Sequence, residues 1–94
     1  MATYRLVGTF NGWNVSDDAY ALTHVKDNCY KIVWENVEAN TEFKIAKDGS
    51  WDFAVGGSRV DHNTGTANTE GSDNIKILES YDKLTVYFFE SANT

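Results

Sequence analysis

Cysteine, proline and cationic residues are scarce in this chain of 94 residues, which has one cysteine, no proline, and 8 lysines and arginines against 14 aspartates and glutamates. Cys29 cannot form an internal disulfide, and no CxxC pattern exists for a metal or redox site. The net charge of −6 argues against a nucleic-acid partner, because nucleic acids require a basic surface. Acidity alone selects no other partner and mainly keeps a small domain soluble.

Long apolar runs and helical patterns are also missing. No run approaches the roughly 18 residues that a membrane span needs, so no membrane partner is expected. No amphipathic helical window is longer than one turn. Met1-Ala2 leads directly into a strand pattern without a signal peptide, which is typical of a domain cut from a longer chain. We expect residues 1–94 to form one module, monomeric within a larger protein.

Aromatic residues are abundant at 14%, and apolar and polar residues alternate along much of the chain. Both properties favour β-strands. The expected strands cover 3–8, 20–25, 29–35, 42–46, 50–55, 74–78 and 84–90. Gly56-Gly57 is expected to end the strand 50–55, a long loop is expected over 58–73, and a turn at 81–83. Seven or eight short strands predict an all-β fold, an immunoglobulin-like antiparallel sandwich, although the Cys…Trp…Cys pattern of antibody domains is absent.

Residues 42–52 combine an amphipathic strand, a tight turn and a large flat ring. The strand alternates, so Lys44 and Ala46 are expected to point away from the core. Asp48-Gly49 is a strong hairpin-turn signal, and Trp51 follows it. An aromatic ring held near a lysine on a rigid hairpin predicts a sugar-binding surface.

The other two tryptophans lie in contrasting contexts. Trp13 follows an Asn-Gly turn signal in a loop that is expected to leave the ring exposed. Trp34 shares a strand face with Tyr30 and Ile32, which predicts a place in the core. Tyr87 and Phe89 are expected on the face of the second sheet.

Three motifs occur in a fixed order along the chain. They are Gly8-Thr9-Phe10-Asn11-Gly12-Trp13, Phe43-Lys44-Ile45 followed by Trp51-Asp52, and Gly71-Ser72-Asp73-Asn74-Ile75. Together they resemble the starch- and glycogen-binding modules of amylases, pullulanases and related proteins. In that family the motifs are Gly-x-Phe-Asn-x-Trp, then Phe/Tyr-Lys-apolar with Asp-Gly-x-Trp, and an asparagine before the penultimate strand. The resemblance spans residues 4 to about 78.

The resemblance includes the glycogen-binding domain of the AMP-activated kinase β subunit, where the matching tryptophans and lysine line the sugar site. It therefore implies sugar-binding roles for Trp13, Lys44, Trp51 and Asn74. A shift of one residue in the third motif would put Asp73 in place of Asn74.

Two features depart from the kinase domain, namely Gly56-Gly57 and the polar loop 58–73. They are more similar to bacterial starch-binding modules of secreted amylolytic enzymes and surface proteins. The resemblance thus implies an extracellular or cell-surface location within a larger bacterial protein. Asn11 of the first motif and Phe53, which could extend the aromatic surface, complete the candidate site.

These residue types suit an α-1,4-glucan, which curves and shows an apolar face and a hydroxyl edge on each glucose. Two tryptophans at an angle can each stack on one sugar, for about 1–3 kcal/mol apiece by analogy with base stacking. Lys44 and Asn74 can bind the hydroxyls. We expect non-catalytic α-glucan binding with a Kd between about 10 μM and 1 mM, strengthened by avidity from sibling modules.

Several alternatives remain at this stage. The sandwich could instead be a protein-interaction or spacer domain, or its sugar could be a β-glucan or xylan. Oxygen-bearing side chains between 61 and 73 suggest calcium, but Gly65 takes a ligand position and no glutamate closes the loop, so no metal is predicted. Catalysis and a cofactor are not expected, because a glycosidase needs two carboxylates at fixed separation in a cleft.

Overall fold

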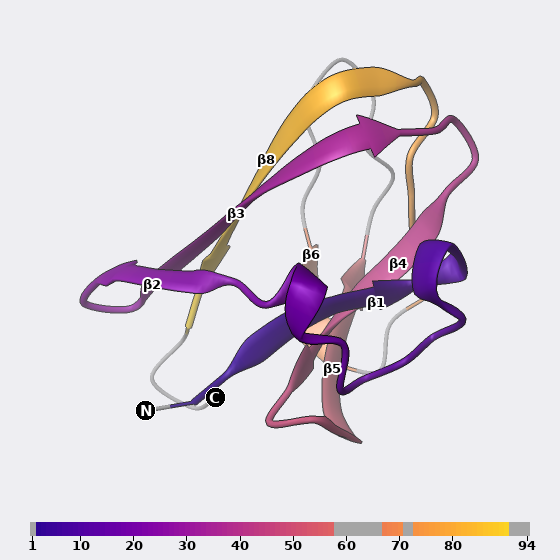
Figure 1. Ribbon diagram of the computed structural model, residues 1–94. Coiled ribbons are helices and arrows are strands. Elements are labelled where there is room, and N and C mark those ends of the chain that lie inside the picture. Colours follow the sequence, from indigo (N-terminus) through magenta and orange to yellow (C-terminus); the bar gives the residue numbers. More distant parts are fainter. Residues whose placement is uncertain (1, 58–66, 71–72, 91–94) are drawn as a thin grey trace.

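The computed structural model describes residues 2–57, 67–70 and 73–90, with only the backbone for 67–70 (Figure 1). Within these ranges the chain forms eight strands and two short 3-10 turns. In chain order the elements are β1 (Tyr4–Gly8), η1 (Thr9–Asn11), η2 (Asp18–Tyr20), β2 (Thr23–Lys26), β3 (Cys29–Val37), β4 (Glu42–Lys47), β5 (Ser50–Gly57), β6 (Ala67–Glu70), β7 (Ile75–Lys76) and β8 (Tyr81–Phe89).

The strands form two antiparallel sheets. Sheet A has the order β1-β4-β5-β6, with β7 also paired to β4, and sheet B has the order β2-β3-β8. The buried core cluster draws on both sheets and consists of Tyr4, Leu6, Leu22, Tyr30, Trp34, Val37, Phe43, Ile45, Val55, Ile75, Ile77, Leu84 and Phe88. The predicted all-β sandwich and the predicted burial of Trp34 are confirmed. No helix in the described ranges is long and apolar enough to cross a membrane.

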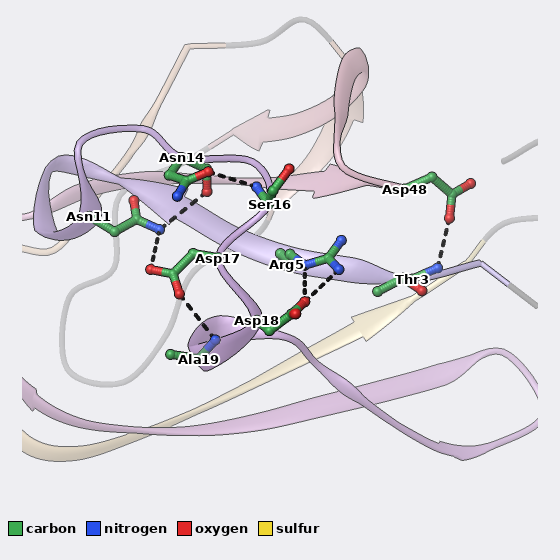
Figure 2. A network of polar contacts seen from close by, with 9 residues as sticks. All are labelled: Thr3, Arg5, Asn11, Asn14, Ser16, Asp17, Asp18, Ala19 and Asp48. Carbon is green, nitrogen blue, oxygen red and sulfur yellow. Dashed lines mark hydrogen bonds and ion pairs between the residues drawn. The ribbon is translucent and has the colours of Figure 1, made fainter.

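The face of sheet A that points away from the core is partly covered. Alternation along β1 and β4 puts Arg5 and Ala46 on this outer face, and the register pairs them with each other and Ala46 with Ala54. Ala46 is nevertheless completely buried, and so is Val7. The segment between β1 and β2 lies across β1 on this side (Figure 2). The outward direction predicted for Ala46 holds, but its exposure to solvent does not.

Two predictions, a turn at 81–83 and the end of a strand at Gly56-Gly57, are wrong. Residues 81–83 open β8 instead of forming a turn, because Tyr81 pairs with Val37 and Lys83 with Glu35. Gly56-Gly57 belongs to β5 and pairs with β6, which lies inside the expected loop 58–73. In both places backbone pairing with a neighbouring strand decides the conformation, and the residue pattern does not reveal that pairing.

Two other strands are shorter than expected. Within the expected strand 74–78 only Ile75–Lys76 is ladder-paired to β4. The expected strand 20–25 is replaced at its start by η2, and β2 begins at Thr23. Tyr20 packs against Phe10 at a ring-centroid distance of 4.5 Å, and both rings pack against the core.

Candidate functional site

Trp13 is presented by a closed loop that begins directly after β1. Its backbone N–H donates to the carbonyl of Gly8 at 2.9 Å. Gly12 and Trp13 both adopt left-handed conformations, with φ of 65° and 61°. The side chain of Asn11 accepts from the Gly8 N–H at 3.1 Å. Phe10 packs against the core residue Trp34 at 4.7 Å, which fixes the start of the loop to the sandwich.

A network of polar contacts holds the rest of this loop against β1 (Figure 2). Arg5, whose side chain is only 16% exposed, donates to Asp18 from Nη2 at 2.7 Å and from Nε at 3.1 Å. Asp17 accepts from the N–H of Ala19 and from Nδ2 of Asn11. These contacts therefore fix the loop to β1, a strand of sheet A.

Trp51 is presented by the β4–β5 hairpin. Asp48 and Gly49, the two central turn residues, have φ of 54° and 69°, the combination of a type I′ turn. The backbone of Asp48 donates to the carbonyl of Thr3 at 2.7 Å, and its carboxylate accepts from the N–H of Thr3 at 2.9 Å. A Cβ at Gly49 would lie 3.5 Å from Oγ of Ser16, so the hairpin turn also contacts the loop of Trp13.

A bulge follows the hairpin turn. Lys47 pairs with Ser50, but the next pair along the ladder is Ala46 with Ala54, so residues 51–53 bulge out of the sheet. Trp51, the first residue of this bulge, keeps 49% of its surface exposed. The bulge thus lifts a large ring out of the plane of the strands.

The structure brings the two predicted tryptophans together. The ring centroids of Trp13 and Trp51 lie 6.2 Å apart, and the ring planes are inclined at 42°. We call these two residues the aromatic pair. Trp13 is half-buried and Trp51 is exposed, so the pair borders solvent on the side of sheet A that faces away from the core.

Polar residues continue this outer face along β4. Glu42 pairs with Lys76 of β7, and Phe43 with Ile75, where the ladder ends; Asn74 directly precedes Ile75. Since directly opposite residues share a face, and so do alternate residues of a strand, the side chains of Glu42, Lys44 and Lys76 lie on the outer face. Asn74 donates from Nδ2 to Oε1 of Glu42 at 3.3 Å. We call Glu42, Lys44, Asn74 and Lys76 the polar cluster.

The other three predicted site residues make contacts of their own. Asp73 is exposed, and its carbonyl accepts from the N–H of Gly57 at 2.9 Å. Phe53 packs against the core and lies under Nζ of Lys47, 5.6 Å from its ring centroid. The side chain of Asn11 is hydrogen-bonded to Gly8, Asn14 and Asp17, which indicates that it shapes the loop of Trp13.

The oxygen-bearing residues between 61 and 73, for which calcium was considered and not predicted, lie mostly outside the described residues. Within the part of the chain that is described, no group of three or more histidines, cysteines, aspartates or glutamates could hold a metal ion. Sequence reasoning missed two contributors, Arg5 and Glu42. Glu42 had a readable signal, because it alternates with Lys44 on the same strand face. Arg5 had no such signal, because its pairing with Asp18 depends on how the chain folds.

Sheet B carries a second aromatic surface on its outer face. Tyr87 and Phe89 are 55% and 62% exposed, and their rings are nearly parallel at 20° with centroids 6.5 Å apart. Val25 and Val33 are also exposed on this sheet. This surface differs from the aromatic pair in the nearly parallel arrangement of its two rings.

No protein-family model matches the chain, and no curated protein matches it significantly. The function must therefore be argued from the residues and from the geometry of the outer face of sheet A.

Proposed function

We propose that the chain is a non-catalytic module that binds α-1,4-glucan, such as starch, glycogen or maltooligosaccharides, and tethers a larger extracellular or surface protein to it. The observation that carries the proposal is the inclined aromatic pair of Trp13 and Trp51. Two rings inclined at 42° can stack on successive units of a curved chain, whereas a flat ribbon-like glucan would require nearly coplanar rings.

Two further features support this proposal. The loop and the hairpin that present the rings are held by hydrogen bonds, an ion pair and a type I′ turn, so little ordering entropy is lost on binding. Lys44 lies on the outer face of sheet A, and Asn74 is hydrogen-bonded to Glu42 of the same strand; both side chains can orient a sugar through its hydroxyls.

The test is retention on insoluble starch and retarded migration in amylopectin gels, together with a titration of tryptophan fluorescence with maltoheptaose. The double variant Trp13→Ala with Trp51→Ala is expected to lose retention, since each stacked ring contributes about 1–3 kcal/mol. Tyr87→Ala is the matched control, because it removes an aromatic ring of similar exposure from the other sheet. Unretarded migration of the unmodified chain would refute the proposal.

The second candidate is a protein-interaction or spacer domain. It is favoured by the exposed surface of Val25, Val33, Tyr87 and Phe89 on sheet B, since large exposed apolar patches mark contact sites on many soluble proteins. Under this alternative, maltoheptaose would leave the tryptophan fluorescence unchanged.

A further inference from the structure

The sugar-binding groups expected on the outer face of sheet A are unbalanced in their hydrogen bonding. Every sugar hydroxyl can both donate and accept, whereas the lysine ammonium of Lys44 only donates. The tryptophans contribute chiefly ring faces. Hydroxyl protons of a bound glucan therefore need acceptors that Lys44 and the aromatic pair do not provide.

The polar cluster contains one carboxylate that can meet this need. Glu42 lies two residues from Lys44 on the same strand face, so the two Cα atoms are about 7 Å apart. Its side chain is partly buried and accepts a hydrogen bond from Nδ2 of Asn74 at 3.3 Å. Its backbone N–H donates to Oγ1 of Thr9, at the start of the loop that carries Trp13.

The contact with Asn74 also sets the direction of the amide. One N–H of Asn74 is directed to Glu42, which leaves the second N–H and the carbonyl oxygen for a ligand. A carboxylate oxygen has capacity for more than one hydrogen bond, so Glu42 can hold Asn74 and still accept from a hydroxyl.

We infer that Glu42 is a further sugar-binding residue, which accepts a hydrogen bond from a hydroxyl of the glucosyl unit next to the aromatic pair and orients Asn74 toward the same unit. This inference rests on the proposed function. The adjacent ammonium of Lys44 and carboxylate of Glu42 then serve as donor and acceptor for neighbouring hydroxyls, which selects a sugar with both hydroxyls free. A unit that lacks either hydroxyl leaves one of these charged groups without its ligand partner.

The test uses the whole chain, with maltotriose and an analogue lacking one hydroxyl at the 2- or 3-position of a glucosyl unit as the probes. Glu42→Gln keeps the shape and an acceptor for Asn74 but removes the charge. It is expected to weaken maltotriose binding about fivefold, because hydrogen bonds to charged groups are roughly twice as strong as neutral ones. Glu35→Gln is the matched control, because the side chain of Glu35 is exposed on sheet B, and this variant should bind as the unmodified chain does.

The deoxy analogues give a readout that a structural role would not move. They should bind the unmodified chain more weakly, and Glu42→Gln should add little to the loss for the analogue that lacks the hydroxyl contacting Glu42. Thermal unfolding of each variant reports whether the fold is intact. If the unmodified chain binds maltotriose and Glu42→Gln binds equally well, the inference fails while the proposed function stands. If the unmodified chain binds no glucan, both fail.

Discussion

Gly8 and Glu42 approach each other too closely for any side chain at position 8. A Cβ built on Gly8 would overlap the carbonyl oxygen of Glu42 and lie 2.9 Å from Cβ of Phe43. The φ of Gly8 is −177°, an extended value that any residue adopts, so the requirement is one of space. This approach joins the start of the Trp13 loop to the strand that carries the polar cluster.

We expect Gly8→Ala to lower the free energy of unfolding by about 1–3 kcal/mol, because an added methyl must push the two strands apart. Urea denaturation measures the change. Gly12→Asn is the control, since nothing lies within 4 Å of a Cβ at Gly12 and asparagine tolerates its left-handed backbone. Unfolding midpoints for Gly8→Ala that match those of the unmodified chain would contradict the close approach.

Trp13 and Trp51 should respond oppositely to glycine, although both belong to the aromatic pair. At Trp13 the φ of 61° is unfavourable for any residue with a Cβ, so Trp13→Gly should be about 1 kcal/mol more stable than Trp13→Ala. Trp51 lies in a strand without positive φ, so Trp51→Gly should be less stable than Trp51→Ala by about 0.5–1 kcal/mol. Thermal unfolding of the four variants measures both differences, and the same sign at both positions would refute the argument.

The left-handed backbone conformation of Trp13 could not be predicted from the sequence. The other non-glycine residues of positive φ in the described chain are Asp27, Asn36, Asn40 and Asp48, types that tolerate this region. A tryptophan there is unexpected. It is held by the hydrogen bond to Gly8 and by the surrounding loop, and backbone strain of this kind often accompanies binding sites.

The parts of the fold that depend on alternation could be predicted. Alternating residues located β1, β3, β4 and β8, and Asp48-Gly49 located the hairpin that carries Trp51. The parts that depend on pairing could not. The bulge at 51–53, the pairing of β6 with β5 and the start of β8 at Tyr81 follow from which strands become neighbours. For the same reason, the sequence could not predict the distance between Trp13 and Trp51. The exposure expected for both rings is found for Trp51, whereas Trp13 is half-buried.

Asn11 should act on binding through the loop of Trp13. In Asn11→Asp the oxygen that accepts from Gly8 remains, but the second oxygen replaces an amide that faces the Asp17 carboxylate at 3.4 Å and the carbonyl of Asn14. We expect a loss of about 1–3 kcal/mol in unfolding free energy at pH 7. The loss should shrink as pH falls toward about 4, since protonation of the introduced carboxyl removes its repulsion of the Asp17 carboxylate.

Denaturation of Asn11→Asp at pH 7 and pH 4, alongside glucan retention at both values, measures this effect. Asn14→Asp is the matched control, because Oδ1 of Asn14 accepts from the N–H of Ser16, a bond that a carboxylate keeps. A pH-independent loss of glucan binding in Asn11→Asp, with unchanged stability, would instead indicate direct contact with the sugar.

We expect the ionisation of Tyr30 to lower the stability of the sandwich at alkaline pH. Burial in the core raises the pKa of Tyr30 above its ordinary value of 10.0, and the nearby carboxylates of Glu90 and Asp48 raise it further. Above about pH 10 the unfolded chain therefore loses the phenolic proton first, while the folded chain retains it. The contribution of Tyr30 to stability is complete below pH 10 and is lost as pH rises through its folded pKa.

Tyr30→Phe should flatten the decline of unfolding free energy above pH 10, whereas Tyr87→Phe, which changes an exposed ring, should leave it unchanged. Equal alkaline slopes for Tyr30→Phe and the unmodified chain would show that another group causes this decline.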